Sequence, residues 1–172
     1  EVDARDAAVR ELTDFVLKDA RAHEALLRGV REKLGSYQYT PEQVLFELFQ
    51  NADDATRDLR DLAREAEASS AASRGFVVSV DRGRPILRVQ HFGRAINRGD
   101  VSAGPQRSSR SYELDLKNML LLHLSDKDEL STGRFGLGFK SVHLLTARPR
   151  VRSGDLSFEI VGGLVPVHVP LE

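Results

Sequence analysis

Residues 47–55, Glu-Leu-Phe-Gln-Asn-Ala-Asp-Asp-Ala, form the stretch on which a prediction of the fold depends most. Just before it, Thr40 is a favourable N-cap, Pro41 suits the first helical position, and Gln43 completes a capping-box pattern. These signals predict a helix that begins at residue 41 and continues to about residue 68. Apolar residues recur along it at helical spacing and are expected to face a core: Val44, Leu45, Leu48, Phe49 and Ala52.

Polar residues occupy another face of this predicted helix. Glu47, Asn51 and Asp54 stand at positions i, i+4 and i+7, so their side chains share one side. A carboxylate and an amide one turn apart can hold a water molecule and Mg²⁺, which takes oxygen ligands from protein, water and phosphate. Asn51 could bind the metal, and Glu47 could accept a proton from an attacking water. The alternative is an ordinary solvated face of an amphipathic helix.

A second stretch, residues 133–141, reads Gly-Arg-Phe-Gly-Leu-Gly-Phe-Lys-Ser. Its glycines at i, i+3 and i+5 allow backbone N–H groups to approach an anion, and a helix from Leu137 to about Leu145 would favour phosphate at its start. Arg134 and Lys140 add positive charge. The spacing fits neither the Walker A sequence nor the dinucleotide fingerprint, and a glycine-rich segment by itself is usually only a turn.

Together the two stretches resemble two motifs of the gyrase, heat-shock chaperone, histidine kinase and MutL (GHKL) ATPase superfamily. The wording of the second is most similar to the sacsin and "no vein" branch. The resemblance covers about residues 26–164 and implies that Glu47 is the catalytic base and that Asn51 binds Mg²⁺. It also implies that ATP is bound by Asn51, Asp54, His91, Gly93, Ile96, Gly133, Arg134, Phe135, Gly136, Leu137, Gly138, Phe139, Lys140 and Ser141.

The third motif of the family, Asp-x-Gly-x-Gly, is altered in this chain. Gly93, Ile96 and Asp100 fit it, but His91 stands at the position of the Asp that accepts a hydrogen bond from the adenine amino group, and Ala95 replaces the second glycine. A carboxylate only accepts hydrogen bonds, whereas a neutral imidazole has one acceptor and one donor. His91 could therefore accept the amino hydrogen in the right tautomer. It could also indicate a changed choice of base or a lost site, or be a structural histidine at a strand end.

The resemblance implies an α+β fold: a two-layer Bergerat-type sandwich with a mixed, mostly antiparallel sheet covered by helices on one face. Residues 1–172 would be a single ATP-binding domain, with N-terminal helices in residues 1–35 and an ATP lid in residues 101–132. The family's closing strands are not recognisable, so we expect a truncated sheet. Arg107 and Arg110 could reach phosphate from the lid, or belong to an ordinary polar loop.

The implied function is slow Mg²⁺-dependent hydrolysis of ATP to ADP and phosphate, driving lid closure and conformational change in a larger multidomain protein. The alternative is a nucleotide-gated or degenerate interaction module without catalysis. Expected partners are ATP or ADP, further domains of the same protein, and a second copy in a dimer, to which the N-terminal helices could contribute as an exchanging arm.

Composition limits the other classes. A net charge of −1 gives no overall electrostatic case for nucleic acid, and no apolar run is long enough for a membrane span. Cysteine is absent, which excludes disulfides and thiolate metal sites and is compatible with a cytoplasmic protein.

Patterning predicts the remaining elements. Residues 3–34 read as helix, with a break between Asp19 and His23 and an end near Gly35. Residues 76–80 and 85–90 read as a hairpin around an Asp-Arg-Gly turn, and residues 114–124 have helical spacing. Residues 151–152 and 157–161 read as strands, and residues 164–169 as a last strand or an extended tail.

Overall fold

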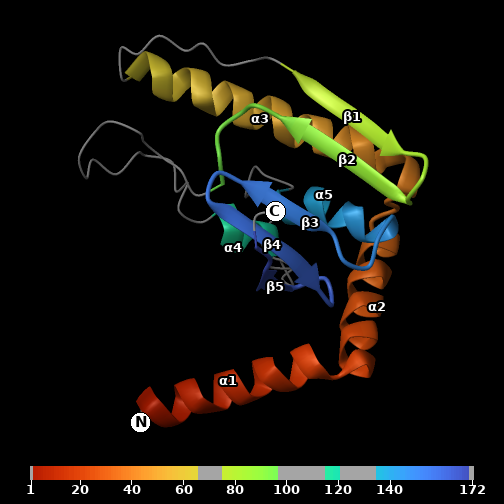
Figure 1. Ribbon diagram of the computed structural model, residues 1–172, viewed down its shortest axis with the longest axis vertical. Helices are drawn as coiled ribbons and strands as arrows, with labels where there is room; N and C mark the ends of the chain where they lie inside the picture. Colours follow the sequence, from red (N-terminus) through yellow and green to blue (C-terminus); the bar gives the residue numbers. More distant parts are fainter. Residues whose placement is uncertain (1, 66–74, 97–114, 121–134, 171–172) are drawn as a thin grey trace.

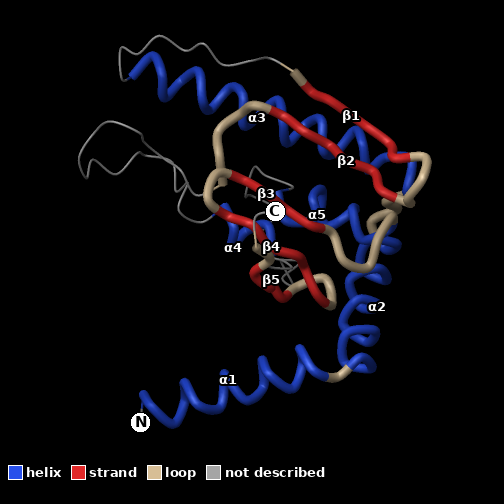
Figure 2. Tube along the Cα trace, viewed as in Figure 1, coloured by secondary structure: helices blue, strands red, loops and turns tan. Residues whose placement is uncertain are grey.

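The computed structural model describes residues 2–65, 75–96, 115–120 and 135–170, and its elements are shown in Figures 1 and 2. The helices are α1 (Val2–Lys18), α2 (Ala20–Ser36), η1 (Pro41–Gln43), α3 (Val44–Glu65), α4 (Asp115–Leu120), α5 (Phe135–Lys140) and η3 (Ser141–Leu144). The strands are β1 (Phe76–Asp81), β2 (Ile86–His91), β3 (Arg150–Ser153), β4 (Leu156–Val161) and β5 (Val165–His168).

The predicted break in the N-terminal helix is confirmed at Asp19. Its carboxylate accepts hydrogen bonds from the backbone N–H groups of Arg21 (2.8 Å) and Ala22 (3.3 Å) and so caps α2. α1 extends away from the body of the molecule, whereas α2 runs along it (Figure 1). After α2 the left-handed backbone conformation is taken by Gln38, with φ of 59°, and not by Gly35, where a glycine C-terminal signal was expected.

The predicted helix from residue 41 is also confirmed, as η1 followed by α3. The Gln43 side chain accepts a hydrogen bond from the Thr40 N–H at 3.0 Å. Its expected core face is only partly buried, because Val44 and Ala52 are buried but Leu45 and Phe49 are 38% and 49% exposed. Phe49 meets Phe76 of β1 edge to face at 5.3 Å between ring centroids, so this part of α3 faces the hairpin and not the main core.

β1 and β2 form the predicted antiparallel hairpin. Phe76 is opposite His91 at its open end, and Asp81 is opposite Ile86 at the turn. The Asp81 carboxylate accepts a hydrogen bond from the Gly83 N–H at 2.8 Å, which fixes the turn locally. Because residues directly opposite each other share a face, His91 lies on the same face as Phe76 and therefore toward α3.

The second sheet has the antiparallel order β3-β4-β5. The segment left open as a strand or a tail contains the edge strand β5, in which Pro166 is opposite Ile160. The turn between β4 and β5 has left-handed glycines, Gly162 (φ 60°) and Gly163 (φ 79°). A Cβ on Gly163 would lie 2.8 Å from Val30 Cγ2, so α2 packs directly on this turn.

The α+β class is confirmed, but the described residues do not form the single sheet that the resemblance implies. They form separate sheets of two and three strands, both antiparallel (Figure 2). The buried core residues come from α2, α3, η3 and β4, and η3 contacts both α2 and α3. They include Val30, Leu34, Val44, Val142 and Ile160. Within the described ranges, no helix combines the length and apolarity that crossing a membrane requires.

The helix predicted for residues 137–145 differs from the structure. It begins two residues earlier, at Phe135, and changes at Ser141 into the 3₁₀-helix η3. A 3₁₀-helix has about 3.0 residues per turn instead of 3.6, so the inward-facing positions shift. A continuous α-helix over residues 137–145 would place Val142 and Leu145 on one inner face, but Val142 is buried together with His143, which is 0% exposed, and Leu145 is 47% exposed.

Candidate functional site

α3 presents the three predicted polar residues on successive turns, and each is partly buried. The Asn51 side chain has no hydrogen-bond partner among the described residues, so its oxygen is available to a ligand. The Asp54 carboxylate instead accepts from Arg57 at 3.3 Å, and Arg57 also pairs with Asp53. Asp54 is thus engaged within the helix surface, whereas Asn51 is not.

Glu47 lies directly against the glycine-rich stretch. A Cβ added to Gly138 would stand 2.5 Å from Glu47 Oε2, closer than any real Cβ contact. Gly138 is buried in α5, so a side chain at this position would force the Glu47 carboxylate to move. The structure therefore brings together the predicted base and the predicted phosphate-binding stretch, which are 91 positions apart in the sequence (138 minus 47).

The structure describes only part of the remaining glycine-rich stretch. Gly136, Leu137 and Phe139 are in α5, which begins at Phe135. Gly133 and Arg134 lie outside the described residues, as do most of the predicted lid, including Arg107 and Arg110, and Asp100 of the third motif.

Lys140 occupies a different place from the one expected of a phosphate-binding cation. It is 1% exposed, and its ammonium donates hydrogen bonds to the carbonyl oxygens of Leu120 (2.7 Å) and Gly163 (2.9 Å). Burial lowers the pKa of Lys140 to about 8. The neighbouring Ser141 is also buried, and its hydroxyl donates to the Gly138 carbonyl at 2.6 Å. Lys140 therefore links α5 to α4 and to the turn after β4, whereas Ser141 bonds within its own helical segment.

The end of β2 contacts α3 about two turns after Glu47. A Cβ on Gly93 would lie 2.7 Å from the carbonyl carbon of Ala55 and 2.8 Å from the Thr56 nitrogen. The Arg94 N–H donates to the Ala55 carbonyl at 2.8 Å. Further on, the Ile96 N–H donates to Ser153 Oγ at 2.9 Å, linking this segment to β3.

His91 immediately precedes this contact. The Gly93 N–H donates a hydrogen bond to His91 Nδ1 at 3.3 Å. Partial desolvation lowers the pKa of His91 although the residue is exposed, so its ring is neutral at pH 7. With Nδ1 as acceptor, a neutral ring has its hydrogen on Nε2.

Arg94 was not identified from the sequence and is the most connected side chain at this end. It is 9% exposed and forms ion pairs with Asp115 of α4 (2.6 Å) and Asp58 of α3 (3.3 Å). Its partners are 21 and 36 residues away along the chain, so no local pattern indicates them. Arg94 joins the end of β2, α3 and α4 in one cluster.

Both contacts are made to the same helix. Glu47 and Ala55 are eight residues apart, which corresponds to about 12 Å along α3. Asn51 lies halfway between them. One helix thus aligns a carboxylate against a glycine, an amide with no partner in the described ranges, and the strand end that carries His91.

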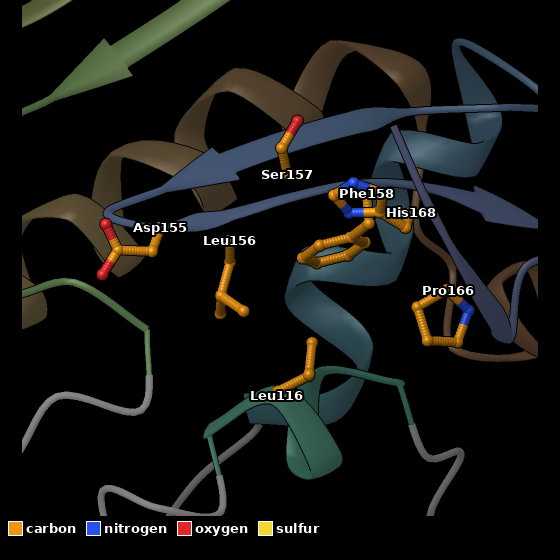
Figure 3. A pocket seen from close by; sticks show the side chains of 7 residues that line it. All are labelled: Leu116, Asp155, Leu156, Ser157, Phe158, Pro166 and His168. Atoms are coloured by element: carbon orange, nitrogen blue, oxygen red, sulfur yellow. The ribbon is translucent and has the colours of Figure 1, made fainter. Parts of the chain in front are cut away.

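A hollow of about 210 Å³ lies elsewhere, between the β3–β5 sheet and α4. Its apolar lining includes Leu116, Leu156 and Phe158, and Asp155 and His168 lie at its opposite ends (Figure 3). None of the predicted site residues lines this hollow. It is therefore distinct from the α3 arrangement.

A scan of protein-family models gave no match, and neither did comparisons with the curated proteins and with the solved structures. Interpretation of the site therefore depends on its own chemistry and on the motif resemblance.

Proposed function

We propose that this chain is an ATP-binding domain of the sacsin-like branch of the GHKL superfamily and that it hydrolyses ATP slowly with Mg²⁺. The observation that carries the proposal is that α3 contacts the glycine-rich stretch through Glu47 and the altered third motif through Ala55. The finer fold assignment, a Bergerat-type sandwich, belongs to the same proposal, as does a place in a larger multidomain protein.

The residues present fit a magnesium site of the kind that phosphate completes. Among the described residues no group of three or more His, Cys, Asp or Glu side chains could hold a metal ion alone. Mg²⁺ bound with a nucleotide needs only one or two protein ligands, since water and phosphate oxygens supply the rest. The Asn51 oxygen, which has no partner among those residues, would hold it. The ion would supply neutralisation of phosphate charge.

In this proposal Glu47 is the base that activates the attacking water. Its carboxylate is partly buried beside Gly138, so it would accept a proton from a water located between α3 and α5. The N–H groups near Gly138 would position the terminal phosphate for that water. Positioning and charge neutralisation supply most of the rate enhancement in such chemistry.

A second function, nucleotide-dependent switching without catalysis, is favoured by one specific observation. Lys140 is buried against carbonyl oxygens and supplies no charge to phosphate. The Glu47 carboxylate of α3 therefore lies beside α5, near the expected phosphates, and the Lys140 ammonium is not directed there to compensate its charge. Such a module would bind nucleotide and change its contacts, with little turnover.

Calorimetry of ATP binding with and without Mg²⁺, together with phosphate release, tests the proposal. Glu47→Gln should retain binding and lose turnover by at least about a hundredfold. Glu42→Gln, an exposed glutamate in η1, is the matched control and should behave as the wild type.

Equal turnover by Glu47→Gln and wild type would refute the assignment of the base. Binding without turnover in both proteins would select the switching module. Absence of nucleotide binding and of any thermal stabilisation by ATP would refute both, because a ligand specific for the folded state must raise its stability.

A further inference from the structure

The hydrogen bond within the third motif fixes which atoms His91 can offer to a ligand. Nδ1 accepts from the Gly93 N–H at 3.3 Å, so its lone pair is used inside the protein. The neutral ring then has its hydrogen on Nε2, and the charged ring has hydrogens on both nitrogens. In either protonation state, Nε2 can only donate.

The backbone on which this bond depends is held firmly in place. Gly93 is in contact with the Ala55 and Thr56 backbone with no room for a Cβ, and the next N–H donates to the Ala55 carbonyl at 2.8 Å. The donor to Nδ1 is therefore fixed relative to α3. A rotation of the ring that freed Nδ1 would leave the Gly93 N–H without its acceptor.

Nε2 of His91 is available to a ligand. The described residues include no hydrogen-bond partner for Nε2. This nitrogen is also not among the buried side-chain atoms that lack a partner. His91 lies on the face of the hairpin that looks toward α3, opposite Phe76, whose ring contacts Phe49. In the proposed function the motif resemblance assigns the base to His91, so this nitrogen is the atom that would meet the base.

We propose that His91 selects a base with a hydrogen-bond acceptor at position 6, so that the nucleotide is a 6-oxopurine triphosphate in preference to ATP. The inference rests on the proposed function, because it concerns the base of the same nucleotide. The 6-amino group of adenine is a donor, and two donors facing each other leave a hydrogen bond unmade. The O6 atom of hypoxanthine or guanine is an acceptor and pairs with Nε2–H.

Calorimetry with Mg²⁺ and either ITP, GTP or ATP tests this inference on the wild type and on His91→Asp. ITP differs from ATP at position 6 but lacks the 2-amino group of GTP, so it isolates the group in question. The wild type should bind ITP and GTP about tenfold more tightly than ATP, the ratio expected for one hydrogen bond. His91→Asp, whose carboxylate accepts, should reverse the order.

His168→Asp is the matched control, since His168 is an exposed histidine of β5 outside the α3 arrangement. It should leave the ITP-to-ATP ratio unchanged. Tighter binding of ATP than of ITP by the wild type would overturn the inference and leave the proposed function standing. If neither the wild type nor His91→Asp binds any of the three nucleotides, the proposed function is overturned as well.

A ¹⁵N spectrum of the histidine rings gives a test independent of nucleotide. The inference requires the Nε2–H tautomer for the neutral ring of His91. A signal from the Nδ1–H tautomer would overturn it.

Discussion

The hairpin β1–β2 and the sheet β3–β5 differ in how far their apolar side chains are buried. In β4, Ile160 and Val161 are 1% and 2% exposed, whereas in the hairpin Val80 and Leu87 are 67% and 43% exposed. The buried apolar side chains are concentrated in the body formed by α2, η3 and β4, and the contacts described between the hairpin and α3 lie at the open end of the hairpin, at Phe76 and Gly93. The proposed nucleotide would contact both parts, with phosphates near the body and the base near the hairpin.

The largest expected effect comes from the body. Ile160→Ala should lower the free energy of unfolding by about 2–5 kcal/mol, because it leaves a cavity among closely packed side chains. Urea unfolding followed by circular dichroism measures the change. A loss below about 1 kcal/mol would mean that β4 is not the centre of the core.

A pH effect within the same body should come next. Burial, followed by the nearby Lys140 charge, lowers the pKa of His143 to about 4, and Arg31 contributes in the same direction. The Thr146 backbone lies close enough to raise this pKa slightly, but neither ring nitrogen has a hydrogen bond of normal geometry. The buried ring is therefore held neutral.

His143 binds a proton below about pH 6.5 in the unfolded chain but only near pH 4 in the folded chain. Its contribution to the free energy of unfolding is therefore complete above pH 6.5 and is lost as the pH falls from 6.5 to 4. Between pH 7.5 and pH 5 the loss from this residue should be about 2 kcal/mol. His143→Leu should remove that part of the pH dependence. Equal losses in wild type and variant, measured by urea unfolding at both pH values, would contradict it.

The junction between the two parts should give a smaller effect. Gly93→Ala introduces a Cβ against the α3 backbone and should destabilise by about 1–3 kcal/mol, with the loss concentrated in the hairpin. Amide hydrogen exchange of β1 and β2 measures it. Gly29→Ala is the control, because a Cβ there has no atom within 4 Å, and alanine in a helix gains up to about 1 kcal/mol. Unchanged hairpin exchange in Gly93→Ala would separate the hairpin from α3.

The smallest effect is expected at the exposed face of the hairpin. Val80→Thr should change the free energy of unfolding by less than about 0.5 kcal/mol, since the side chain is mostly solvated. The same urea titration measures it. A loss comparable to that of Ile160→Ala would mean that another segment or a second copy covers this face in solution.

Local chemistry explains what the sequence could predict. The helix break at Asp19, the Thr40–Gln43 signal and the Asp81 turn depend on residues within four positions of one another, and each lies where it was expected, although the capping role of Asp19 was not predicted. The same is true of the spacing that aligns Glu47 and Asn51 on α3.

Contacts between residues far apart in the chain explain the features that the sequence could not predict. The burial of Lys140 depends on carbonyl groups 20 and 23 positions away, and Arg94 finds acidic partners on two other helices. The change from α5 to η3 exchanges the environments of His143 and Leu145, which a regular 3.6-residue period does not anticipate. Likewise, the division into two sheets depends on strand pairing and not on strand pattern.

Asp19 gives the N-terminal helix the mechanics of a lever. A single residue, with φ −98° and ψ 109°, separates two helices of 17 residues each. At 1.5 Å per residue α1 is about 25 Å long, so a rotation of about 10° at Asp19 displaces its far end by roughly 4 Å. A spectroscopic label near the start of α1 would therefore amplify small rotations at this joint into distances that are easily measured.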